Sequence, residues 1–149
     1  KAGADGIVFG ILGHESINLK ATRELVILAK SLGLSTTFHR AFDAVKNQEE
    51  ALEQLIDLGL DRVLTSGTIW GSKQGALEGL AVIRALLEQA RGRIEIIVGG
   101  GINKTNIKEI MQGLEGYSNF SIHAYSGVQE NGMTTISAVK MLSHLISES

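Results

Sequence analysis

The sequence predicts an α/β fold in which repeated strand–helix units build one parallel sheet. Five short runs rich in β-branched and aromatic residues cover residues 6–12, 35–41, 62–66, 94–98 and 120–125. The segments between them have the 3.6-residue periodicity of amphipathic helices. The runs recur at a nearly constant interval, and this regular alternation is typical of βαβ units with a parallel sheet.

Each segment between the runs, and the one after the last run, carries an apolar stripe at helical spacing. The first stripe ends before Gly33 and the second before Gly59, where a glycine is typical of a helix C terminus. Asn47 and Glu50 have capping-box spacing at the start of the second helix, and Asn103 is the predicted N-cap of the fourth. In chain order, the stripes are Ala21, Leu25, Leu28 and Leu32; Ala51, Leu52, Leu55 and Ile56; Leu80, Ile83, Leu87 and Ala90; Ile107, Ile110, Met111 and Leu114; and Ile136, Val139, Leu142, Leu145 and Ile146.

Two parallel architectures fit five such units. A five-stranded doubly wound sheet needs about the length of this chain, whereas a (β/α)8 barrel of the TIM type needs roughly 250 residues. We expect the barrel, with residues 1–149 as a single-domain C-terminal segment of about five strands and helices and the first three units missing. Residues 1–6 resemble the end of a helix that leads into a strand, which implies an upstream unit. The strands also carry polar residues that fit a barrel lumen, namely Thr37, His39, Ser121 and His123.

Composition and charge exclude several classes of function. The net charge is −2, so no basic surplus favours nucleic acid or an anionic membrane surface. No stretch of about 18 apolar residues predicts a membrane-spanning helix. The 149 residues include no cysteine, which excludes thiolate metal sites and cysteine nucleophiles within this segment. A cytoplasmic protein is the default expectation, and a homo-oligomer is compatible with this composition.

The densest group of chemically active side chains follows the second predicted strand. His39, Arg40 and Asp43 lie at the C-terminal strand ends, where parallel α/β folds place their ligand sites. A histidine can act as acid, base or metal ligand, and an arginine can clamp a carboxylate or phosphate. The alternative is that these groups bond only strand-end backbone, with Asp43 capping the following turn.

A second candidate site follows the next three strands. Gly99, Gly100 and Gly101 precede a predicted helix, and backbone amides in such a turn can bind an anion. Ser126 follows the last strand at a corresponding position. Barrels often bind phosphate between the last two such loops, so we expect a small-anion site here. The hydroxyls of Thr65 and Ser66 could contribute to it, or could bond their own turn.

Three further features have a structural and a functional interpretation. Trp70 lies in the glycine-flanked loop 68–75, which could close over a site as a lid or pack on the rim. Met111, Met133 and Met141 lie on or next to helices, where filling of the core is a better interpretation than a copper box. His14 and His144 receive no predicted role.

The same residues resemble the CutC copper-homeostasis family. The resemblance rests on blocks at 3–10 (GADGIVFG), 37–43 (TFHRAFD), 61–67 (DRVLTSG) and 76–79 (ALEG), and on 99–101 with Asn103. It implies a (β/α)8 barrel of the cytoplasm that is associated with copper tolerance, and it places His39, Arg40, Asp43 and the glycine turn at the family's cavity.

This sequence departs from the family pattern in three ways. The loop between Gly67 and Ala76 is longer than in many members, and the last strand with His123 follows the family ending only loosely. Copper sites proposed for some members use cysteines, which are absent here. Copper is therefore a partner implied by the resemblance alone.

Three functions remain open at this stage. The first is a copper-homeostasis protein that binds copper. The second is a barrel enzyme that acts on a phosphorylated or carboxylated small molecule, with His39 as acid/base, Arg40 as anion clamp and Asp43 as the orienting group. The third is a scaffold without a site.

Overall fold

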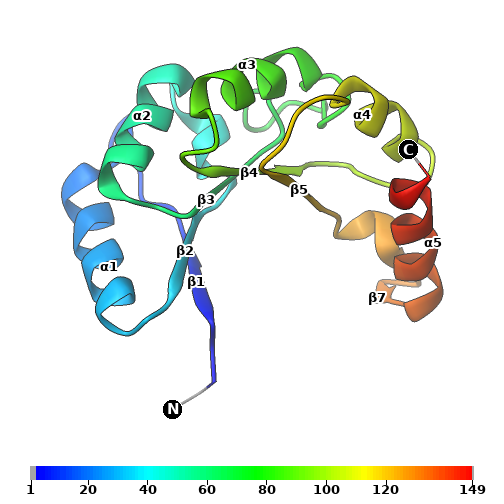
Figure 1. Cartoon of the computed structure of the whole chain (residues 1–149), viewed down its shortest axis with the longest axis horizontal. Coiled ribbons are helices and arrows are strands. Elements are labelled where there is room, and N and C mark those ends of the chain that lie inside the picture. Colours follow the sequence, from blue (N-terminus) through cyan, green and yellow to red (C-terminus); the bar gives the residue numbers. More distant parts are fainter. Residues whose placement is uncertain (1–2, 149) are drawn as a thin grey trace.

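A computed structural model describes residues 3–148 and shows a single curved parallel sheet with helices packed along it (Figure 1). In this part of the chain the sheet contains five strands in the order β1-β2-β3-β4-β5. They are β1 (Gly6–Phe9), β2 (Ser35–Phe38), β3 (Arg62–Thr65), β4 (Glu95–Gly99) and β5 (Phe120–His123). The helices are α1 (Leu19–Ser31), α2 (Gln48–Leu58), α3 (Leu80–Ala90), α4 (Ile107–Gly113) and α5 (Ile136–Ser147), with short 3-10 turns η1 (Arg40–Ala44) and η2 (Ser126–Val128).

The strand order decides between the two expected architectures. Every strand pairs in parallel with the next one along the chain, as in the registers Gly6 with Ser35 and Arg62 with Glu95. A doubly wound sheet requires the strand order to reverse at a switch point, and no reversal occurs here. Figure 1 shows α1 to α4 as an arc along the same side of the sheet. Sequential parallel strands with helices on one side form part of a (β/α)8 barrel, so this prediction is confirmed.

The predicted strands are all present, although most are shorter than the sequence runs. The second run continues to residue 41 in the sequence, but β2 stops at Phe38 because the chain turns into η1 at Arg40. Residues 1 and 2 of the helix end predicted over 1–6 lie outside the described residues, and residues 3–5 are not helical.

Side chains and glycines end the helices largely as the sequence indicates. Asn47 Oδ1 accepts a hydrogen bond from the backbone N–H of Glu50 at 3.2 Å, and Gly59 ends α2 with a positive φ of 77°. Asn18 and Thr135 cap α1 and α5 in the same way, through Ala21 and Ala138. These caps satisfy N–H groups that the first helical turn leaves without partners.

The core lies between the sheet and the helices. Along β3, Val63 and Thr65 are fully buried on the helix side, while Arg62 and Leu64 are only partly buried on the other face. The largest fully buried side chains come from the three central units, from β2 to α4: Phe38, Phe42, Leu52, Leu55, Ile83, Leu86, Ile94, Ile96, Ile102, Ile107, Ile110 and Leu114.

Two predicted apolar stripes are wrong in detail. In α1 the buried face consists of Thr22, Val26 and Ala29, whereas Leu28 and Leu32 are exposed. The helix α1 packs mainly on β2 and α2, so the narrower face with small side chains is buried and the leucines remain outside. In α5 only Leu142 is buried, and Ile136 and Val139 are exposed, because α5 packs on α4 and η2 rather than on the sheet. Thr22 carries the one buried side-chain polar atom in residues 3–148 that has no hydrogen-bond partner.

The predicted start of the fourth helix is also wrong. The helix α4 begins at Ile107, with Asn106 at the N-cap position. Asn103 instead forms a turn, in which its Oδ1 accepts from the N–H of Thr105 at 2.8 Å. The side chains of Asn103 and Asn106 both donate to the carbonyl of Gly101. These amide groups therefore fix the end of the glycine turn, and α4 has only 7 residues.

An ion pair ties α2 to the end of α3 on the outer surface. Arg93 donates Nη1 and Nη2 to the two oxygens of Glu53, each at 2.8 Å, and Gln89 adds a hydrogen bond at 2.9 Å. These hydrogen bonds, first that from Arg93 and then that from Gln89, lower the pKa of Glu53 to about 2. The pair crosses between neighbouring units, so it fixes one helix against the next.

A two-stranded hairpin precedes α5. It pairs β6 (Gln129–Glu130) with β7 (Met133–Thr134) in antiparallel fashion, and its turn is Asn131-Gly132 with both residues at positive φ. Asn-Gly is the dipeptide that such tight turns favour, so this signal was present in the sequence. Among the described residues, no helix is both long and apolar enough to pass through a membrane.

Candidate functional site

The candidate site lies where the strands end, at the C-terminal edge of the sheet. Because β2, β3, β4 and β5 are parallel neighbours, the segments that follow them meet in the same order. These segments are η1, the Thr65–Thr68 turn, the turn at Gly100 and Gly101, and η2. Most residues that the sequence singles out therefore come to one edge of the structure.

Asp43 is the centre of a buried hydrogen-bond network. The residue is 2% exposed, and its Oδ2 accepts from Arg40 Nε and Ser66 Oγ, each at 2.8 Å. Its Oδ1 accepts a short hydrogen bond from Thr65 Oγ1, and the N–H of Ser66 donates to the same carboxylate at 3.1 Å. Four donor groups from two neighbouring units thus satisfy a buried carboxylate, as burial of a charge requires.

Arg40 is held by this network on two of its three nitrogens. Nε donates to Asp43, and Nη2 donates to Ser66 Oγ at 2.7 Å. The guanidinium carbon lies 5.5 Å from the ring centroid of Trp70, in a cation–π contact. The third nitrogen, Nη1, faces Gly100, where an added Cβ would lie 3.4 Å from it. Within residues 3–148, Nη1 makes none of the hydrogen bonds of Arg40.

The glycine turn lies beside this free edge of Arg40. Gly100 and Gly101 have positive φ values of 114° and 69°, which a side chain would strain. A Cβ on Gly100 would also lie 2.8 Å from Ser66 Cβ, so the close approach of β3 and β4 segments requires glycine. The carbonyl of Gly100 accepts from Ala76, and within residues 3–148 the N–H of Gly101 makes none of the backbone hydrogen bonds outside the helices and strands.

The segment after β5 lies against the end of the same turn. A Cβ on Gly127 would collide with the carbonyl oxygen of Ile102 and lie 2.8 Å from Asn103 Cα. Ser126, the preceding residue, is exposed at the start of η2. Gly99 is buried, and an added Cβ there would lie 3.4 Å from His123, which is exposed at the end of β5.

His39 lies apart from the Asp43 network. Its Nδ1 accepts from the N–H of Ala41 at 3.0 Å, so the neutral imidazole carries its proton on Nε2. The ring lies against Gly10 at the end of β1, where a Cβ would come within 2.6 Å of Nδ1. No hydrogen bond within the described residues joins His39 to Arg40 or Asp43. The carboxylate therefore orients Arg40 and not the histidine.

Thr65 and Ser66 use their polar groups inside the protein. Thr65 Oγ1 donates to Asp43 and accepts from the N–H of Gly67 at 2.9 Å, and the residue is fully buried. Ser66 Oγ joins Asp43, Arg40 and Thr68. Both residues act on the site by positioning charged groups. The part played by Asp43 as the common acceptor could not be found from spacing alone.

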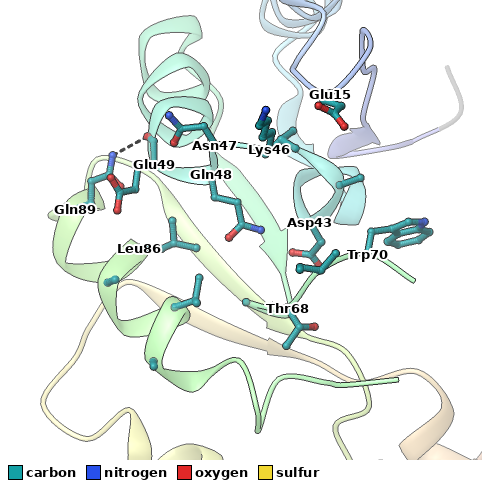
Figure 2. A pocket seen from close by; sticks show the side chains of 17 residues that line it. Glu15, Asp43, Lys46, Asn47, Gln48, Glu49, Thr68, Trp70, Leu86 and Gln89 are labelled. Atoms are coloured by element: carbon teal, nitrogen blue, oxygen red, sulfur yellow. Dashed lines mark hydrogen bonds between the residues drawn. The ribbon is translucent and has the colours of Figure 1, made fainter. Parts of the chain in front are cut away.

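A groove of about 1220 Å³ lies outside the sheet, between the start of α2 and the exposed side of α3 (Figure 2). Gln48 and Glu49 line one wall, and Val82 and Leu86 line the other. Figure 2 shows Trp70 at the edge of this groove, on the loop that also carries Thr68. Asp43, which holds Arg40, also lines the groove, so the groove extends to the Arg40 site.

The side chains do not fit a copper centre. Residues 3–148 hold no group of three His, Cys, Asp or Glu that could bind a metal ion. The soft sulfur donors that Cu(I) prefers are limited to three methionines, on α4, β7 and α5. Met111 is partly buried against the core, while Met133 and Met141 are exposed.

Comparison with known proteins identifies the family. The sequence profile of the CutC family matches residues 1–123. This chain belongs to the CutC family. A mouse relative named copper homeostasis protein cutC homolog is 44% identical over 132 residues, which cover 88% of this chain and 46% of the relative. A Vibrio campbellii CutC family protein is 42% identical over 113 residues, 75% of this chain and 44% of the relative. The chain thus spans less than half of these CutC relatives.

Solved structures agree with the family and with the fold. The crystal structure of a CutC copper homeostasis protein from Streptococcus agalactiae matches with a TM-score of 0.68 and 34% identity, over 80% of this chain and 56% of that one. A native KDPGal structure matches with a TM-score of 0.62 over 98% of this chain and 60% of that one. Its identity is only 15%, so the second likeness shows the fold alone.

Proposed function

We propose that this CutC-family chain serves copper homeostasis, as the names of its mouse and human relatives state, through a small-anion site centred on Arg40. The observation that carries the proposal is the placement of Arg40. Asp43 and Ser66 hold two of its nitrogens, and the third lies beside the glycine turn at Gly100, outside the hydrogen bonds of the described residues. A cytoplasmic location is part of the proposal and rests on the family resemblance.

The arrangement favours a carboxylate or phosphate for three reasons. The guanidinium always carries its charge, and its side chain is 30% exposed, so an anion can reach it. Its orientation is set before a ligand arrives, which reduces the entropy cost of binding. The neighbouring glycine turn lets the backbone approach an anion closely, and the N–H of Gly101 supplies a further donor.

Direct binding of copper receives less support from this chain. The described residues lack a fitting donor set, so we derive no step through the metal. The anion site and the copper role are compatible, because a homeostasis protein can act on a small molecule. Titration of the protein with Cu(I) tests direct binding, and an affinity tighter than about micromolar would return copper coordination to the proposal.

Acid/base catalysis on the bound anion is the second candidate function. One observation favours it: the hydrogen bond from Ala41 fixes the His39 tautomer, and thereby leaves Nε2 as the nitrogen that exchanges a proton with a ligand. In this scheme Arg40 clamps the anion and Asp43 positions Arg40. A H39Q variant that binds the anion normally but turns it over no faster than buffer would support this candidate.

Isothermal titration with inorganic phosphate tests the anion site. Loss of a charge-assisted hydrogen bond costs about 1.5–3 kcal/mol, so we expect R40Q to weaken binding by about tenfold to a hundredfold. The matched control is R23Q, because Arg23 is an exposed arginine on α1. Equal phosphate affinity in the wild type and R40Q would refute the site, as would absence of binding by the wild type.

A further inference from the structure

The one tryptophan of the chain lies beside the proposed anion site. Trp70 is 57% exposed, although tryptophan is the largest apolar side chain and usually packs inside. Its ring lies over the Arg40 guanidinium at 5.5 Å. Ile69, the preceding residue, is 79% exposed and is absent from this contact. The loop therefore presents the indole to the site edge, with much of its surface uncovered.

Hydrogen bonds hold the loop 68–75 in this position. The backbone N–H of Trp70 donates to the carbonyl of Asp43 at 3.0 Å, which fixes the indole to the segment that carries Arg40. At the far end, Gly75 donates its N–H to Glu78 Oε2 at 2.7 Å, and this bond lowers the pKa of Glu78. Next to it, Ala76 donates to the carbonyl of Gly100. The loop thus contacts the site at both ends, and the indole is placed without a ligand.

The contacts of Arg40 limit the direction from which an anion can bind to it. Nε and one N–H of Nη2 donate to Asp43 and Ser66, and the guanidinium carbon lies over the Trp70 ring. The N–H groups left for an anion are therefore on the Nη1 side, beside the Gly100 turn. Groups attached to such an anion extend past an aromatic surface, where a flat ring gains stacking and burial of apolar area.

We propose that Trp70 contacts the ligand and selects anions that carry a planar ring, such as aromatic or heteroaromatic phosphates and carboxylates. This inference rests on the proposed anion site and goes beyond it by naming the ligand class. In the proposal, Arg40 and the glycine turn bind the charged group, and Trp70 stacks on the ring.

Titration calorimetry with three probes tests the inference: inorganic phosphate, phenyl phosphate and cyclohexyl phosphate. We expect phenyl phosphate to bind about tenfold more tightly than phosphate, and cyclohexyl phosphate to fall between them. The W70L variant should lose the advantage of phenyl phosphate over phosphate, and W70F should retain most of it. The control I69A, in the same loop, should behave as the wild type. Because Trp70 is the only tryptophan, phenyl phosphate should also change the fluorescence of the wild type.

The outcomes separate the two proposals. If phosphate binds in an Arg40-dependent manner but phenyl phosphate binds no more tightly, or W70L keeps the phenyl advantage, the role of Trp70 is refuted and the anion site stands. Equal affinity for phenyl and cyclohexyl phosphate would refute selection of planar rings. If none of the probes binds the wild type, the anion site itself fails.

Discussion

The replacement of Asp43 by asparagine tests whether the buried network holds the C-terminal edge together. Asparagine keeps one carbonyl oxygen in the place of Oδ1, which can still accept from Thr65 and, at 3.3 Å, from the N–H of Ser66. Its NH2 group then occupies the place of Oδ2 and faces Arg40 Nε and Ser66 Oγ, which both donate to the carboxylate. A donor thus meets a donor, and the positive charge of Arg40 loses its partner.

The magnitude follows from these contacts. One charge-assisted hydrogen bond contributes about 1.5–3 kcal/mol, and a buried polar group left without a partner costs about 1–3 kcal/mol. Ser66 Oγ can rotate and accept instead, which recovers part of the loss. We therefore expect D43N to lower the free energy of unfolding by about 2–4 kcal/mol, a large part of the roughly 5–15 kcal/mol typical of a domain.

Urea unfolding followed by circular dichroism measures the effect. With a slope of about 1–3 kcal/mol per molar urea, the midpoint should fall by at least about 0.7 M. The matched control is E24Q, the same change at an exposed carboxylate on α1, and it should leave the midpoint unchanged. If D43N and E24Q unfold at the same urea concentration, the network contributes nothing and the reasoning fails.

Two further predictions concern stability. Thr22 buries a hydroxyl without a partner, so T22V, which has nearly the same shape, should raise the free energy of unfolding by about 1 kcal/mol in urea titration; a loss of stability would reveal a hidden partner. Arg93 lowers the pKa of Glu53 to about 2, so the charged pair stabilises the fold above pH 4.5 and this stabilisation disappears as the pH falls toward 2. Between pH 5 and 2, the free energy of unfolding should therefore fall less steeply for E53Q than for the wild type. Identical slopes for the two proteins would disprove the role of the Glu53–Arg93 pair.

Periodicity and turn chemistry predicted the fold because they act locally. The five runs form strands, and α2 begins after Asn47 and ends at Gly59 as expected. The regular interval between strands also predicted the parallel sheet, because a helix between two strands carries the chain back to the edge where the first strand began. The choice of the barrel over a doubly wound sheet needed the strand order, which spacing alone does not contain.

The errors have a common physical origin. The stripe with Leu28 and Leu32 has helical spacing, but spacing does not say which of two apolar faces meets the sheet. Asn103 and Asn106 can both cap a helix, and the competition was decided by bonds to the Gly101 carbonyl, far from any helical pattern. Tertiary contacts decide which helix face is buried and which residue caps a helix, and local patterns in a single sequence do not predict those contacts.

The sequence predicted that the residues of the candidate site lie close together, but it did not predict which hydrogen bonds join them. Parallel strands had to bring Arg40, Ser66 and Gly100 to one edge, and the structure does so. The expectation that Asp43 orients His39 or Arg40 left two partners open, and the hydrogen bonds select Arg40. Which carboxylate oxygen meets which donor depends on side-chain rotamers, which follow from packing rather than from order along the chain.

The shared network has a consequence for the way such proteins can be recombined. Asp43 and Arg40 follow β2, their hydroxyl partners follow β3, and the glycines that admit them follow β4. A chimera that takes one strand–helix unit from a distant homologue would lose the hydrogen bonds between that unit and its two neighbours. A recombined protein therefore keeps the site only if the units that begin with β2, β3 and β4 are transferred together.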